Sequence, residues 1–140
     1  MIALRQAHAN EIVRHARESA PYECCGLIGG LNDGRALTIY RMRNIASEPL
    51  VTYEAAPEEL FAAQRAMRER GENLLAIYHS HPRADIPVPS ATDVRLAYYP
   101  SAVYFIVGLA GQQPELGAFR ISESEGRWEP AEYEVVADAG

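Results

Sequence analysis

The chain has 140 residues and a mass of 15.5 kDa, enough for one domain with little room for a second. Apolar residues make up 48% and charged residues 23%, as in ordinary globular proteins, which excludes disordered and fibrous chains. With 13 basic against 19 acidic residues, the net charge is −6, unfavourable for gripping nucleic-acid phosphates. We therefore expect one domain over residues 1–140 that binds no nucleic acid.

The first half of the chain predicts one helix and several strands. A stripe of apolar residues at spacings of three and four predicts a helix over residues 7–19, which Pro21 ends. The apolar run over residues 24–30 reads as a buried strand. Across a turn of Asn, Asp and Gly, residues 35–42 alternate as its hairpin partner. We expect a further short strand over residues 51–53.

The second half predicts a second helix and the central strands. Pro57 suits a helix start and Gly71 a helix stop, and the apolar face between them should be Leu60, Phe61, Ala63 and Met67. Apolar runs predict strands over residues 74–78, 102–109, 116–121 and 133–136. Helices interleaved with central strands predict an α/β fold, with a mixed central β-sheet flanked by helices.

Two sequence features concern the compartment and the cysteines. No apolar run approaches the ~20 residues that cross a bilayer, and the first residues lack the order of a secretory signal. Cys24 and Cys25 are adjacent, and neighbours of that kind rarely form a disulfide. We expect a cytoplasmic protein that does not associate with membranes, with both thiols packed inertly in a buried strand.

Two histidines follow the predicted buried strand that ends at Tyr78. His79 and His81 are separated by one residue, and in an extended backbone such residues point to the same side. Both imidazoles could then bind one metal ion. The alternative is a polar strand end that faces water. His8 and His15, by contrast, lie among charged neighbours on the first helix, where we expect both to be solvated.

A carboxylate downstream strengthens the metal interpretation. The loop over residues 82–89 holds three prolines and leads to Ser90 and Asp93, whose spacing is that of a helix capping box. A cap of this kind would hold the Asp93 carboxylate stiffly, as a third ligand must be held. Two imidazoles and one carboxylate leave a fourth position open on zinc, the layout of a catalytic site. Water in that position has a pKa near 7, which provides a hydroxide nucleophile.

These residues resemble a known family. The run from His79 to Pro82, with the later run from Pro89 to Asp93, is similar to the JAMM (MPN-plus) signature of zinc metallopeptidases. Upstream, residues 21–30, which include Glu23 and a Cys-Gly-Leu triplet, resemble the family's first conserved strand. The two blocks follow each other in the family's order, and the resemblance covers most of the chain. It suggests a small, stand-alone bacterial-type member with a cytidine-deaminase-like fold.

The resemblance also implies roles for individual residues. His79, His81 and Asp93 would bind one Zn2+, with water as the fourth ligand. Glu23 would act as general base and then general acid, and Ser90 would stabilise the oxyanion. The implied activity is hydrolysis of the bond after a Gly-Gly C-terminus of a ubiquitin-like or sulfur-carrier protein. The alternative is a catalytically silent scaffold of the same fold that binds protein partners.

One departure from the family pattern leaves an alternative ligand open. Eight residues separate His81 from Ser90, one more than the family usually has. The extra residue lies in the proline-containing loop, where length is most easily absorbed. A rearranged ligand set could instead use Asp85, which follows His81 closely but has no helix start to position it. We expect Asp93 to be the ligand.

Overall fold

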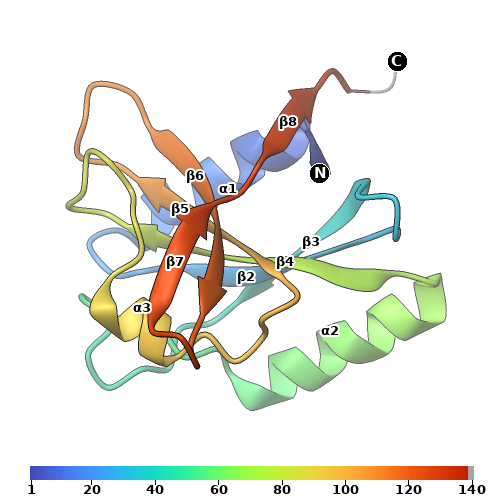
Figure 1. Ribbon diagram of the computed structural model, residues 1–140, viewed down its shortest axis with the longest axis horizontal. Coiled ribbons are helices and arrows are strands. Elements are labelled where there is room, and N and C mark those ends of the chain that lie inside the picture. The colour runs from blue at the N-terminus through green and yellow to red at the C-terminus, as the bar shows by residue number, and fades with distance from the viewer. Residues whose placement is uncertain (139–140) are drawn as a thin grey trace.

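Figure 1 shows the computed structural model, which describes residues 1–138. Its helices are α1 (Gln6–Ser19), α2 (Pro57–Arg70) and α3 (Ala91–Arg95). Its strands are β1 (Ile2–Arg5), β2 (Cys25–Gly30), β3 (Ala36–Met42), β4 (Asn73–His81), β5 (Val103–Gly108), β6 (Glu115–Ser122), β7 (Arg127–Pro130) and β8 (Tyr133–Val136). Residues 139 and 140 of the predicted domain lie outside the described residues.

The strands form a mixed central sheet in the order β3-β2-β4-β5-β6-β7. β4 and β5 run parallel, and the other neighbours in this sheet are antiparallel. β1 and β8 form a separate parallel pair. The predicted α/β fold with a mixed sheet flanked by helices is therefore confirmed.

The two long helices cover opposite faces of the sheet, as Figure 1 shows around β2 and β4. Side chains along β4 alternate between two apolar cores. Tyr78 belongs to the core beneath α1, whereas Ile77 belongs to the core beneath α2. By the same alternation His79 and His81 project to the α2 side, and Ser80 projects to the α1 side.

Most of the predicted elements are present, with differences that matter for the site. The strand predicted to end at Tyr78 continues through His81, so the histidine pair lies within β4 rather than after it. The strand predicted over residues 51–53 is wrong, because this segment is a loop without a ladder partner. Phe61 was predicted to lie on the apolar face of α2 but is 66% exposed. β1 and β7 were not predicted.

No helix among residues 1–138 is long and apolar enough to cross a membrane.

His15 lies in the core rather than in solvent, which corrects the sequence prediction for this residue. It is 8% exposed, and its Nδ1 lies 2.7 Å from the hydroxyl of Tyr78. Burial, helped by the nearby positive charge of Arg41, lowers the pKa of His15 from 6.5 to about 4. His8 on the same helix is half-buried.

The lowered pKa of His15 predicts a loss of stability in mild acid. The unfolded chain takes up a proton near pH 6.5 and the folded chain only near pH 4. The contribution of neutral His15 to folding stability is therefore complete above about pH 6.5 and declines as the pH falls toward 4. When the pH is lowered from about 7.5 to about 5, protonation of His15 in the unfolded chain should reduce the free energy of unfolding by up to roughly 2 kcal/mol. Urea unfolding at both pH values measures this, with H15Q as the control. Equal pH dependence in H15Q and the wild type would contradict the assignment.

Candidate metal centre

Three predicted donor atoms meet at the end of β4. His79 Nε2 and His81 Nε2 lie 3.2 Å apart, and Asp93 Oδ2 lies 3.1 Å from the first and 3.0 Å from the second. Donors about 2.0–2.1 Å from a tetrahedral zinc ion would lie about 3.3 Å from one another. The spacing of the three atoms, and the chemistry of two imidazoles with one carboxylate, therefore fit a tetrahedral metal.

Asp93 is held by the capping box that its spacing to Ser90 predicts. Ser90 Oγ accepts the backbone N–H of Asp93 at 3.0 Å, and Asp93 Oδ2 accepts the backbone N–H of Ser90 at 2.9 Å. Burial would raise the pKa of Asp93, but His79, His81 and the Ser90 N–H together lower it below its usual range. The carboxylate is thus ionised beside the two imidazoles.

Asp85, the alternative carboxylate, does not join this cluster. It is exposed, and its Oδ1 accepts the backbone N–H of Ile86 at 2.8 Å within its own loop. The longer loop is nevertheless anchored at both ends. Near its start, Ala84 donates to the carbonyl of His81 at 3.0 Å and accepts from the N–H of Ala110 at 3.0 Å.

Glu23 reaches the site through the pairing of β2 with β4. Cys25 lies opposite His79 in that antiparallel ladder, so the residues before Cys25 run alongside the histidines. Ser80 extends the pairing by one residue. Its Oγ accepts the N–H of Cys24 at 2.9 Å, and its own N–H donates to the carbonyl of Cys24 at 3.3 Å.

The Glu23 carboxylate is buried close to both histidines. Glu23 is 4% exposed, and one of its oxygens lies within 4.8 Å of a ring nitrogen of His79 and of His81. Its Oε1 is buried without a hydrogen-bond partner among residues 1–138. Burial raises the pKa of Glu23 to about 7, and the negative charge of Asp93 adds to this while His81 opposes it. A carboxyl group of this pKa can both accept and donate a proton near neutrality.

Three contacts in and around the site were not predicted from the sequence. The Tyr53 ring stacks on the His79 ring, with centroids 4.5 Å apart and planes inclined by 26°. Ser80 binds the backbone of Cys24, as described above. Asn44 donates to the backbone carbonyl of Glu23 at 3.0 Å. Tyr53 and Asn44 come from the loop between β3 and α2, and no local pattern in that loop indicates what it contacts.

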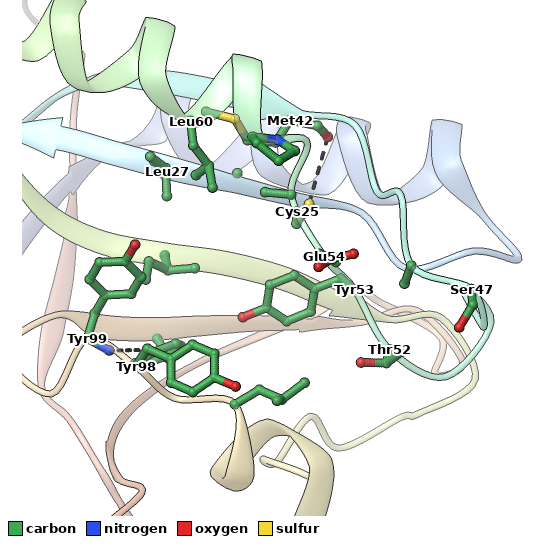
Figure 2. A pocket seen from close by; sticks show the side chains of 17 residues that line it. Cys25, Leu27, Met42, Ser47, Thr52, Tyr53, Glu54, Leu60, Tyr98 and Tyr99 are labelled. Atoms are coloured by element: carbon green, nitrogen blue, oxygen red, sulfur yellow. Dashed lines mark hydrogen bonds between the residues drawn. The ribbon is translucent and has the colours of Figure 1, made fainter.

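A cavity of about 480 Å³ opens beside the metal centre on the α2 side of the sheet. Tyr53 lines it and, through its stacking on His79, separates it from the donor cluster. Figure 2 shows the Tyr53 ring in the middle of the pocket, flanked by labelled apolar and aromatic side chains: Leu27, Leu60, Tyr98 and Tyr99. The cavity on the far side of the Tyr53 ring from His79 is therefore largely apolar.

The two cysteines are buried thiols. Burial raises the pKa of Cys24 to about 11 and that of Cys25 to about 12. Thiolates are the reactive form of cysteine, and at neutral pH almost none is present at such pKa values. Cys25 contributes its side chain to the wall of the pocket in Figure 2.

Comparison with known proteins assigns this fold and site to a family. The family described as prokaryotic homologs of the JAB domain matches residues 5–122. The chain is 42% identical to the desampylase of Haloferax volcanii over 74% of its own length and 77% of that protein. It is 33% identical to the CysO-cysteine peptidase of Mycobacterium tuberculosis over 93% of its length and 89% of that protein.

Solved structures share the fold. A protein from Desulfitobacterium hafniense is 34% identical and superimposes with a TM-score of 0.86, covering 99% of this chain and 94% of that one. A JAB1/MPN domain protein from Archaeoglobus fulgidus is 20% identical, covers 97% of this chain and 99% of that one, and shares the fold with a TM-score of 0.62. The chain therefore belongs to the JAMM/MPN family, as a small prokaryotic JAB-domain member. Within it, the chain is an enzyme, a hydrolase of the JAMM peptidase type.

The two candidate carboxylates predict opposite effects on metal content. We expect D93A to lose bound zinc, because a two-histidine site holds the ion poorly, and D85A to keep roughly one zinc per chain. Elemental analysis of each protein after gel filtration measures this, and D85A is the matched control. Full zinc in D93A with loss in D85A would show that the longer loop re-routes the ligand set.

Proposed function

We propose that the protein is a zinc-dependent peptidase or isopeptidase that cuts after the Gly-Gly terminus of a ubiquitin-like or sulfur-carrier protein. The observation that carries the proposal is the convergence of His79, His81 and Asp93 donor atoms at 3.0–3.2 Å. An oxygen of the buried Glu23 carboxylate lies within 4.8 Å of a ring nitrogen of each histidine. That arrangement would supply three metal ligands and one proton carrier.

The proposed ligands are His79, His81 and Asp93. Zinc bound by them would supply a Lewis acid for the scissile carbonyl and a nucleophilic water at neutral pH. Asp93 contributes the negative charge of the set, and the capping box fixes its oxygen against both imidazoles. Tyr53 limits rotation of the His79 ring by stacking on it.

Glu23 and Ser90 are the proposed catalytic side chains. Glu23 would take a proton from the attacking water on a carboxylate oxygen and then deliver it to the leaving amine. A pKa of about 7 suits a group that must do both. Ser90 Oγ accepts the Asp93 N–H, which leaves its O–H to donate to the oxyanion of the tetrahedral intermediate.

A silent scaffold explains these residues less well. Burying a carboxyl group without a hydrogen-bond partner for one of its oxygens costs stability, and a protein that only binds partners gains nothing from that cost. A group that must change protonation state during each turnover has a reason to be so placed.

The substrate class rests on relatives and on the approach to the site. Besides a desampylase and a CysO-cysteine peptidase, the relatives include a probable TtuB-protein conjugate cleaving protease of Thermus thermophilus, 35% identical over 69% of this chain and 63% of that protein. A Gly-Gly tail has no side chains to exclude it from a narrow path. β4 is paired on both sides, so the tail cannot extend the sheet directly beside the histidines. The anchored loop over residues 82–89 is the proposed wall of the path along which the Gly-Gly tail reaches the metal centre.

The cytoplasm is the proposed compartment, because both cysteines are free thiols.

Glu23 can be tested separately from the metal. E23Q keeps the shape of the side chain but cannot accept a proton, so zinc should stay while turnover falls by roughly 10²- to 10⁴-fold. The measurement is kcat together with zinc content for wild type and E23Q. An active E23Q enzyme with normal zinc would show that Glu23 is not the base.

The substrate prediction is tested with a carrier fusion. A ubiquitin-like carrier followed by a short extension should be cut once, directly after Gly-Gly, with product masses identifying the bond. The same fusion with Ala-Val in place of Gly-Gly should be cut much more slowly, because side chains there would meet the walls of the approach. Equal rates for the two fusions, or cleavage at scattered bonds, would indicate a general peptidase.

A further inference from the structure

We infer that Asn44 is a positioning residue that fixes the backbone of Glu23 beside the metal centre. The inference rests on the proposed role of Glu23 as the proton carrier. Asn44 follows β3, far from the histidines in sequence, and its side chain is half-buried.

The Asn44 amide uses all of its hydrogen-bonding capacity on backbone groups. Its Nδ2 donates to the carbonyl of Glu23 and to that of Thr52, each at 3.0 Å. Its Oδ1 accepts the N–H of Ala46 and of Glu54, each at 3.0 Å. A primary amide has two N–H donors and two acceptor sites, so the side chain is saturated. One side chain thus links Glu23 to the outgoing and the returning segments of the loop over residues 45–54.

Glu23 depends on these contacts because it lies outside the sheet. β2 begins two residues later, at Cys25, so no strand ladder holds the Glu23 peptide groups. Its N–H donates to the carbonyl of Pro49 at 2.8 Å, and its carbonyl accepts from Asn44. Both backbone hydrogen bonds of Glu23 therefore go to Asn44 and the loop that Asn44 closes.

The loop is itself anchored to the rest of the fold. At its neck, the N–H of Ile45 donates to the carbonyl of Glu54 at 2.8 Å, and the N–H of Ala56 donates to that of Arg43 at 3.1 Å. The N–H of Arg43 donates to Glu59 Oε1 on α2 at 2.6 Å. Through Asn44, hydrogen bonds thus hold the backbone of Glu23 in a fixed position relative to β3 and α2. A displacement of about 1 Å at a catalytic group can cost 10²-fold in rate.

Two substitutions separate holding Glu23 from holding the loop. N44D keeps an oxygen for the N–H groups of Ala46 and Glu54 but loses both donated hydrogen bonds, including the one to Glu23. N44A loses all four. N73D makes the same chemical change at an exposed position at the start of β4 and is the matched control.

We expect N44D and N44A to lower kcat on the carrier fusion by roughly 10- to 100-fold. KM and zinc content should stay near wild-type values, and N73D should behave as wild type. In an E23Q background, N44D should cause almost no further loss of cleavage rate, because Asn44 acts through Glu23. The slow cleavage by these variants is measured with enzyme in excess over the carrier fusion. Amide hydrogen exchange of the metal-free protein gives a readout independent of activity. The amides of Ala46 and Glu54 should lose protection in N44A and keep it in N44D.

Three results would overturn the inference. Wild-type kcat in N44D while E23Q is inactive would do so and leave the proposed function intact. An equal loss from N44D in the wild-type and E23Q backgrounds would show that Asn44 acts elsewhere, for example through Tyr53. Wild-type turnover in E23Q would remove the base from the proposed function and the inference together.

Discussion

The register between β2 and β4 is the constraint on which the site depends. It places Cys25 opposite His79 and Gly26 opposite Tyr78. The Tyr78 ring occupies the space that a side chain at Gly26 would need, so glycine is the residue that fits beneath it. A slip of one residue would turn every side chain of the strand to the other face of the sheet. The histidines would then face α1, and the segment that carries Glu23 would no longer run beside them.

The two buried carboxyl groups of the site have opposite pKa shifts because their neighbours differ. Asp93 and Glu23 are 7% and 4% exposed, and burial alone would raise the pKa of both. Asp93 is compensated by two imidazoles and a backbone N–H, so its charged form is favoured. For Glu23 the charge of His81 opposes burial only in part, and its pKa rises to about 7. Two acids whose surroundings separate their pKa values in this way are suited to different tasks. The one whose charged form is favoured suits the proposed metal ligand, and the one whose pKa is raised toward neutrality suits the proposed proton carrier.

What the sequence predicted well depends on short-range physics. The helices over residues 6–19 and 57–70, and the capping box at Ser90, are written in local spacing and local hydrogen bonds. His79 and His81 share a side because alternate residues of any strand do so. The family resemblance supplied Glu23, whose role depends on a strand pairing that no local pattern contains. Zinc, the ligand set and the Gly-Gly substrate remain predictions.

The errors share the opposite property, because each depends on long-range packing. His15 lies among charged neighbours in the sequence, yet its side chain meets Tyr78, 63 residues away. Residues 51–53 have the composition of a strand. In the fold, however, the Asn44 side chain binds the carbonyl of Thr52 and the N–H of Glu54, and the segment is a loop. Phe61 fits the apolar spacing of α2, but the helix buries a narrower stripe that includes Ala63 and Met67. Contacts of Asn44, Tyr53 and Ser80 follow from the assembled sheet and its loops, so only the three-dimensional structure reveals them.

The capping box also explains how the longer loop leaves the donor cluster in place. A helix as short as α3 needs its first N–H groups satisfied, and Ser90 and Asp93 satisfy each other's. The same Asp93 oxygen that accepts from Ser90 faces both histidines, so the requirement of the cap and the geometry of the donor set are met together. Asp85 has no equivalent support, since its carboxylate is occupied by the neighbouring backbone in an exposed turn. Ala84 holds the start of the loop to His81 at the end of β4 and to Ala110 just after β5, and the capping box holds its other end, so the loop is fixed on both sides of its variable part.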